Sequence, residues 1–421
     1  MSTTQLIPMA LKALTPDAWL LFVTRFARLF AYGSLSVILV FYLLGLGLTE
    51  VQSGLVLTLT LAGDVVVSLL LTTRADRVGR RRILVIGAIL MAAAGLAFAS
   101  TRNLFFLILA GTIGVISPSG NEVGPFLSIE QAALTHIVPA TARTEIFAWY
   151  TLTGSLATAL GALFGGFVTQ ALQQTSLSAV ASYRTVVLVY AALGILLAFL
   201  FTRLSALVEV GAVPEGIAPA ASVATVFGIT RSRNVVLKLS SLFALDSFAG
   251  GFVVQSFAAY WFYLRFGVAP ATLGAIFFWA NVFAGISALV ATRLAARIGL
   301  VRTMVFTHLP WNILLILVPL MPNLSLAVLL LLLRFSISQM DVPARQSYTM
   351  AVVPAAERSA AGGFTGVART TGAAISPLFV GFLFAKPSLI NAPFFLAGTL
   401  KISYDLLLYY SFRTLRPPEE Q

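Results

Sequence analysis

The segment Thr72–Arg82, with the sequence TTRADRVGRRR, decides how this chain folds. It carries five arginines and one aspartate, and it joins two apolar stretches, residues 51–73 and 83–100. Each stretch is long enough to cross the hydrocarbon of a bilayer as a helix. A short arginine-rich loop between two such helices stays on the cytoplasmic side of the membrane. The segment therefore predicts a cytoplasmic loop between two membrane-spanning helices.

The composition of the whole chain agrees with this prediction. Of its 421 residues, 59% are hydrophobic and 10% are charged, whereas soluble domains carry about 25% charged residues. The net charge of +12 comes mainly from basic residues in loops on one side of the predicted helices. We therefore expect a lipid bilayer, and no nucleic acid, as the partner. The chain has no cysteine and two histidines, and it predicts neither a metal site nor a cofactor.

Apolar stretches long enough to span a bilayer recur along the chain. A longer polar connection, 205–233, separates them into two sets of six, so we expect bundles at 1–204 and 234–421 joined by a cytoplasmic central loop. The twelve predicted spans are 18–45, 51–73, 83–100, 104–137, 145–171, 184–204, 234–264, 270–293, 301–321, 324–352, 358–384 and 390–412.

Basic residues are divided unevenly between the two sides of these spans. With the N-terminus inside, the inner side receives Lys12, the Thr72–Arg82 segment and most of the remaining arginines. This asymmetry predicts an integral protein of the cell membrane with both termini in the cytoplasm. The basic residues left for the outer side are Arg102, Arg184, Arg265 and Lys386.

The two halves of the chain are a repeat. Val138–Arg143 (VPATAR) aligns with Val353–Arg358 (VPAAER), and Gly54 aligns with Gly274 near the start of each half. Both halves begin on the inner side, so the repeats are parallel. Two parallel six-helix repeats are typical of transporters that bind their substrate between the halves near the membrane midplane.

The Thr72–Arg82 segment also resembles the signature loop of the major facilitator superfamily, Gly-x-x-x-Asp-Arg/Lys-x-Gly-Arg-Arg/Lys. Asp76, Arg77, Gly79 and Arg80 match that pattern, and Thr72 stands at its first glycine. The resemblance implies an all-α membrane protein of twelve transmembrane helices. It also implies that Asp76 and Arg77 contact the other half in one access state. The alternative is that these arginines only set the orientation in the membrane.

The fifth predicted span contains Gly161–Gly166 (GALFGG), which is similar to the antiporter motif of the drug:proton branch of that family. Ala162 stands where the motif has proline. The branch implies proton-coupled export. The alternative is a stripe of small residues that lets helices pack closely.

Ionisable residues within the spans cost about 2.5–3.5 kcal/mol each to insert, so each is a functional candidate. Arg25, Arg28 and Tyr32 share one face of the first span, and Asp64 lies at a similar depth on the second. Asp64 either pairs with one of these arginines or binds a transported proton, with Arg28 facing the cavity.

The fourth predicted span is interrupted by Pro118, Gly120, Gly124 and Pro125. Irregular backbone at membrane depth is tolerated only where it is buried in protein or lines a wet cavity. Asn121 and Glu122 within this interruption are therefore candidates for the central site, and a simple kink is the alternative.

The resembled family lines its cavity with the first, fourth, seventh and tenth helices. This implies that Arg28, Glu122, Asp246 and Arg334 face the substrate, and Asp341 and Arg369 lie at similar depths. The repeat places Glu130 on Arg345, which suggests an inner gate formed by these two residues. Lys401 and Asp405, four apart on the last span, predict a local pair, as do Asp341 and Arg345.

The sequence contains no phosphate-binding loop, metal-ligand spacing or nucleophile–base arrangement, so we expect neither an enzyme nor ATP-driven transport. We predict a monomeric secondary transporter that moves a small organic solute by alternating access, coupled to protons and directed to export. The alternatives are a transporter of an organic anion or acidic metabolite, a non-transporting receptor, and a lipid flippase.

Overall fold

The computed structural model describes residues 14–139, 143–209, 232–354 and 357–413, and within these ranges the regular structure is entirely helical. Most of the predicted central loop, 205–233, lies outside the described residues. Short 3-10 turns among the described residues include η3 (Ala206–Val208), η5 (Val318–Leu320) and η7 (Pro387–Leu389).

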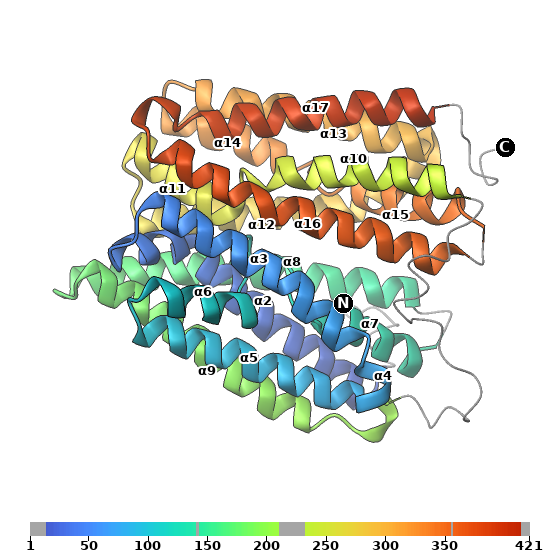
Figure 1. Cartoon of the computed structure of the whole chain (residues 1–421), viewed down its shortest axis with the longest axis horizontal. Helices are drawn as coiled ribbons and strands as arrows, with labels where there is room; N and C mark the ends of the chain where they lie inside the picture. The colour runs from blue at the N-terminus through green and yellow to red at the C-terminus, as the bar shows by residue number, and fades with distance from the viewer. Residues whose placement is uncertain (1–13, 140–142, 210–231, 355–356, 414–421) are drawn as a thin grey trace, which may run out of the picture.

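The helices of the first half are labelled in Figure 1 and pack together as one bundle. They are α2 (Pro16–Gly45), α3 (Glu50–Thr72), α4 (Ala75–Val78), α5 (Arg80–Ser100), α6 (Leu104–Ile113), α7 (Phe126–Ile137), α8 (Arg143–Gln174) and α9 (Ala179–Thr202).

The helices of the second half form the other bundle (Figure 1). They are α10 (Arg233–Gly251), α11 (Gln255–Phe266), α12 (Pro270–Ile298), α13 (Leu300–Leu317), α14 (Leu324–Phe335), α15 (Asp341–Ala351), α16 (Arg358–Phe384) and α17 (Ala392–Phe412).

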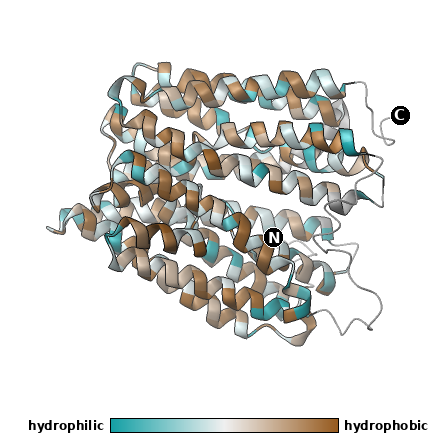
Figure 2. Cartoon of the chain, viewed as in Figure 1, coloured by the Kyte–Doolittle hydropathy of each residue, from teal (hydrophilic) through white to brown (hydrophobic). Residues whose placement is uncertain are grey.

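Nine helical segments in the described residues are long and apolar enough to cross a membrane, with α10 and α11 counted as one. They coincide with nine of the predicted spans. The other predicted spans correspond to α6 with α7, to α14 with α15, and to α17. Hydrophobic residues recur along the helices of both bundles (Figure 2), and many large ones, such as Phe105, Phe167 and Leu406, are exposed, as contact with lipid requires. The predicted all-α membrane fold is confirmed.

Three of the spans are broken in the middle. The break at 114–125 was predicted, and its cause is two prolines together with Gly120 (φ 72°) and Gly124 (φ 79°), which both adopt the left-handed region. The breaks at Phe252–Val254 and Ser336–Met340 were not predicted. Neither break itself contains a proline or glycine, although Gly250 and Gly251 directly precede the first and Pro343 follows the second.

Glycines hold the two bundles together at the end opposite the Thr72–Arg82 segment, which we call the far end. A Cβ on Gly54 of α3 would lie 2.5 Å from the carbonyl oxygen of Pro377 on α16. A Cβ on Gly166 of α8 would overlap the carbonyl of Pro270 on α12. The backbones therefore touch at this end, and the bundles diverge toward the end that carries α4 and α15 (Figure 1).

The hydrogen bonds between the bundles described below likewise lie at the far end and near the middle. Tyr260 donates to Glu50 at 3.2 Å, and the backbone N–H of Ala271 donates to Gln170 at 3.0 Å, both at the far end. Nearer the middle, Gln255 Nε2 donates to Ser36 Oγ at 2.8 Å. With the predicted orientation, this is an inward-facing form, closed at the far end.

Replacing Gly166 by leucine should prevent this closure, because the side chain has no room beside Pro270. We expect a shift toward a form open at the far end. The natural chain has no cysteine, so a single Val254→Cys variant reports access to the cavity through maleimide labelling from the far side. Gly166→Leu should accelerate that labelling several-fold.

Gly363→Leu is the matched control, because Gly363 has open space around it. It should leave the labelling rate unchanged. An equal rate in the Gly166→Leu variant and its parent would contradict the closing role of this contact.

Candidate functional site

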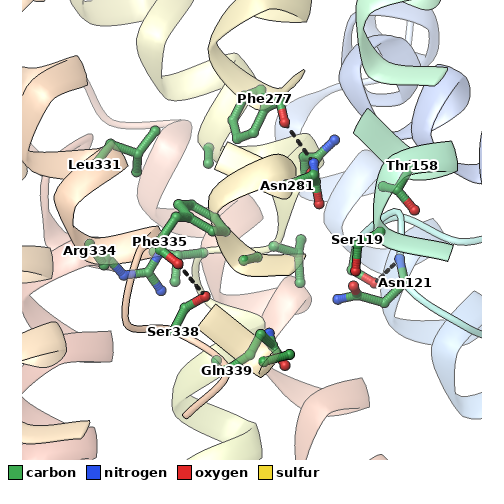
Figure 3. A pocket seen from close by; sticks show the side chains of 18 of the residues that line it. Ser119, Asn121, Thr158, Phe277, Asn281, Leu331, Arg334, Phe335, Ser338 and Gln339 are labelled. Atoms are coloured by element: carbon green, nitrogen blue, oxygen red, sulfur yellow. Dashed lines mark hydrogen bonds between the residues drawn. The ribbon is translucent and has the colours of Figure 1, made fainter. Parts of the chain in front are cut away.

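A cavity of about 320 Å³ lies between the two bundles. All three helix breaks contribute to its wall, through Asn121 and Glu122, through Val253 and Val254, and through Ser338 and Gln339. The close-up in Figure 3 shows Asn121 and Arg334 on opposite sides of it. Irregular backbone at membrane depth is therefore found where it lines a cavity, as expected. The predicted central position of Asn121 and Glu122 agrees with this geometry.

Uncharged polar side chains supply part of the wall. Asn281 of α12 donates to the carbonyl oxygen of Phe277 at 2.7 Å and to Gln255 Oε1 at 3.1 Å. The first of these bonds is drawn in Figure 3. Because Gln255 also bonds to Ser36, these amides connect α12 to α11 and then to α2 in the other bundle. Sequence reasoning missed Asn281, since nothing local marks one asparagine in an apolar helix.

Two arginines and two glutamates form a charge-balanced cluster in the first bundle. Arg28 NH1 lies 2.6 Å from Glu130 Oε1, and Arg28 NH2 lies 3.2 Å from Glu122 Oε2. Arg25 NH1 lies 2.7 Å from Glu122 Oε1, although without hydrogen-bond alignment. Tyr150 donates to Glu130 Oε2 at 2.5 Å. Arg28 and Glu130 are fully buried, so Arg28 supports the cavity wall from behind and does not line it.

The predicted pairing of Asp64 with Arg25 or Arg28 is wrong. Asp64 Oδ1 instead accepts the backbone N–H of Gly124 at 2.5 Å and the hydroxyl of Ser68 at 3.2 Å. The arginines turn toward the glutamates because Glu122 and Glu130 offer two charges at closer range.

Asp64 and Tyr32 both form hydrogen bonds to the break in the fourth span without lining the cavity. The Tyr32 hydroxyl donates to the carbonyl oxygen of Val123 at 3.4 Å, next to the Gly124 N–H that Asp64 accepts. Neither residue lines the cavity in this form. The proton-binding role of Asp64 remains a prediction.

A second cluster occupies the middle of the other bundle, around Asp246 of α10. Lys401 Nζ lies 2.5 Å from Asp246 Oδ1, and Arg345 NH1 lies 3.2 Å from Asp246 Oδ2. Arg345 NH1 also lies 3.2 Å from Asp341 Oδ2, as the predicted i,i+4 pair requires. The predicted Lys401–Asp405 pair is wrong, because Lys401 reaches across to α10. Asp405 contacts His308 and Asn312 of α13 instead.

The predicted contact between Glu130 and Arg345 is absent from this form, since each residue is bonded inside its own bundle. The gate was expected to close when the cavity opens outward, so it remains a prediction. In this form the repeat shows a different relation. Its first and fourth helices carry Arg28 and Glu130 in one bundle and Asp246 and Arg345 in the other. Equivalent places in the two bundles therefore hold ion pairs of opposite polarity.

Arg334 differs from every other cation of the cavity wall. It is 7% exposed, and its Nε has no hydrogen-bond acceptor in the described part of the chain. Its guanidinium carbon lies 4.5 Å from the ring centre of Trp311 and 5.0 Å from that of Phe335. It therefore faces the cavity with aromatic neighbours but no carboxylate among the described residues (Figure 3). Arg369, another candidate, lies on α16 outside the cavity wall.

The Thr72–Arg82 segment forms a compact loop at the end of the first bundle. Asp76 Oδ1 accepts from Arg80 Nε at 2.9 Å, and Gly79 adopts φ 108°. The carboxylate of Glu209 accepts the backbone N–H groups of Arg80 and Arg81, at 2.7 and 3.1 Å, and so caps α5. The contact of Asp76 and Arg77 with the other half in one access state remains a prediction.

Residues 21–267 match the family model of the Major Facilitator Superfamily. The uncharacterized membrane protein YJR124C of Saccharomyces cerevisiae is 32% identical over 427 residues, which cover 95% of each chain.

Solved structures with the same fold include transporters of several kinds. A bacterial homolog of the human lysosomal transporter Spinster, inward-facing and unoccupied, is 15% identical over 94% of both chains, with a TM-score of 0.69. A D-xylose–proton symporter is 16% identical over 93% of this chain and 97% of its own, also with a TM-score of 0.69. The human organic anion transporter MFSD10 is 17% identical over 94% and 100%, with a TM-score of 0.62.

The contribution of each buried charge in the first bundle to the free energy of unfolding should depend on the other three. Glu130→Gln leaves two buried arginines with one carboxylate, and breaking a buried pair in this way costs about 3–5 kcal/mol of unfolding free energy. Thermal unfolding of the detergent-solubilised protein should shift clearly downward. The double variant Arg28→Met/Glu130→Leu should recover most of the loss, because Arg25 and Glu122 then remain as a balanced pair.

Glu145→Gln on the exposed side of α8 is the control and should leave the transition in place. If the double variant is no more stable than Glu130→Gln alone, charge balance is not what the cluster contributes.

Proposed function

Because the chain belongs to the Major Facilitator Superfamily of transporters, we propose that it is a secondary transporter whose substrate is a small organic anion. The observation that carries this proposal is Arg334, a buried cation on the cavity wall without a carboxylate partner among the described residues. Leaving a buried charge uncompensated is costly. An anionic group on the substrate would remove that cost.

The surroundings of Arg334 suit a planar anion. A guanidinium offers two parallel N–H donors that match a carboxylate or a similar oxyanion. The rings of Trp311 and Phe335 hold the guanidinium without competing for those donors, since aromatic faces attract cations but accept no strong hydrogen bond.

The charges and the size of the cavity point the same way. Its wall includes Arg25, Arg334 and Lys401 but one carboxylate among the described residues, Glu122, which two arginines already contact. A cavity of about 320 Å³ is at the lower end of the range of about 300–1,000 Å³ for ligand sites. We infer a small, negatively charged solute.

Alternating access would proceed by rocking of the two bundles about the cavity. The far end would open as the glycine contacts separate, and the end with the Thr72–Arg82 segment would close. We take the proton as the coupling ion. On the charge asymmetry of the loops, we place both termini in the cytoplasm. We further infer that the monomer transports, because one chain supplies both walls of the cavity.

Drug:proton export is the second candidate, and it rests on the Gly161–Gly166 stretch. A Cβ on Gly161 or Gly165 would overlap backbone carbonyls of α2, at Phe30 and Ser34. Close packing of α8 on α2 and α12 is sufficient to account for these glycines, so the stretch does not favour export over the anion proposal.

A set of three probes of similar size tests the charge of the substrate. They are benzenesulfonate, benzenesulfonamide and phenyltrimethylammonium, which are anionic, neutral and cationic at neutral pH. Benzenesulfonate should raise the thermal unfolding temperature of the solubilised protein more than the other two. Arg334→Gln should abolish that preference, because glutamine keeps the hydrogen-bonding capacity but not the charge.

Arg265→Gln is the matched control, since Arg265 lies at the far end of α11 outside the cavity wall. It should respond to benzenesulfonate as the natural protein does. Stabilisation by phenyltrimethylammonium, with none by benzenesulfonate, would contradict the anion proposal and favour the second candidate.

A further inference from the structure

A histidine and an aspartate are buried together between α13 and α17, next to the cavity but not on its wall. His308 Nδ1 lies 2.7 Å from Asp405 Oδ1, and Asn312 Nδ2 donates to Asp405 Oδ2 at 2.8 Å. His308 is 2% exposed and Asp405 is fully buried. A carboxylate in such a place needs a balancing charge. Its direct contacts, an imidazole and an amide, supply one only when the imidazole carries a proton.

The cations in direct contact with the neighbouring carboxylates do not reach Asp405. Lys401 contacts Asp246, and Arg345 contacts Asp246 and Asp341. His308, in contrast, touches both Asp246 and Asp405. Its Nε2 lies 3.6 Å from Asp246 Oδ1 while its Nδ1 holds Asp405.

We propose that His308 and Asp405 form the proton-binding site that couples transport, and that Asp246 and Lys401 connect this site to the substrate. The proposal rests on the proposed function, because the connection requires an anion in the cavity. Lys401 is the physical link, since it lines the cavity and also bonds to Asp246.

The coupling follows from competition for Lys401. An anion in the cavity attracts the ammonium group away from Asp246, whose carboxylate then lacks part of its compensation. The protonated imidazole of His308 can replace it, because its Nε2 is already close to the same oxygen. Anion and proton therefore each strengthen the binding of the other, as linkage requires. When the anion leaves, Lys401 returns to Asp246 and repels the imidazolium, which favours release of the proton.

Because the anion and the proton strengthen each other's binding, we predict symport, in which both move in the same direction. The other charged and titratable groups around the dyad are arranged consistently with that role. Arg334, in the anion site, and Lys401 both lie against the ring of Trp311, and Arg345 contacts Asp246 Oδ2, the oxygen that Lys401 and His308 do not contact. The groups that face the dyad from the packed elements are Asp246 on α10, Arg334 on α14, Asp341 and Arg345 on α15, Arg369 on α16, and Lys401 and Tyr404 on α17.

The chain is well suited to a direct test because it contains two histidines. His136 is exposed near the end of α7, so His136→Gln leaves His308 as the one histidine in a folded protein. Its imidazole nitrogens can then be followed by NMR with ¹⁵N-labelled histidine in detergent. These spectra show directly whether the imidazole of His308 is neutral or charged at each pH between 5 and 8, and Asp405→Asn should change the result.

Benzenesulfonate stays ionised across this pH range, so any effect of pH on its binding arises from the protein. At a fixed pH in this range, adding it should raise the charged fraction of His308, whereas benzenesulfonamide should have no effect. Lys401→Gln should keep the pH response of His308 but lose the response to the anion. One charge state of His308 throughout pH 5–8, or a titration that bound benzenesulfonate does not change, would overturn the proposal.

Transport in proteoliposomes separates this proposal from the proposed function. His308→Gln should still exchange labelled for unlabelled benzenesulfonate but should fail to accumulate it under an imposed pH gradient. Accumulation equal to that of the natural protein would overturn the role of the dyad while leaving the anion site intact. If the natural protein does not bind benzenesulfonate, that result counts against the proposed function. The pH response of His308 without ligand would then still decide whether the dyad binds a proton.

Discussion

The compensation of buried charge is the constraint on which the rest of this structure depends. An ion in the interior of a membrane protein is stable only with a partner of opposite sign. In the first bundle Arg25 and Arg28 balance Glu122 and Glu130, while Asp64 is held by hydrogen bonds alone. In the second bundle Arg334 has no carboxylate partner among the described residues, and we propose that a substrate compensates it and that a proton compensates the His308–Asp405 dyad.

The two bundles therefore differ in role although they are repeats. The ion pair between the first and fourth helices is kept in both, with its polarity reversed. Additional ionisable residues on α13 and α17 surround the pair only in the second bundle, in the part of the chain that the structure describes. Helices that would otherwise serve as scaffold thereby acquire titratable groups within reach of the cavity. The charged residues that the first bundle contributes to the cavity wall, Arg25 and Glu122, are paired with each other. The charges that change partners in our proposal therefore belong to the second bundle.

Sequence reasoning succeeded where the signal is local. Length and hydropathy placed the spans, and two prolines and two glycines marked the break that carries Glu122. It failed where the signal depends on the rotation of one helix against another. Lys401 and Asp405 are four residues apart and suit a local pair, yet each reaches a different helix, α10 and α13. The breaks in the seventh and tenth spans were missed because the prolines and glycines near them lie beside the interrupted residues and not within them.

The amino-acid sequence by itself determined the membrane class, the two parallel repeats and the list of charges that must be buried. These follow from composition and spacing, which act on each segment independently of the others. Only the tertiary structure decided which charges meet. Interhelical ion pairs depend on distances of a few ångströms between side chains far apart in sequence, and Arg28 accordingly met Glu130, not Asp64. The structure also left Arg334 without a carboxylate partner among the described residues, because the side chains packed on it are the rings of Trp311 and Phe335.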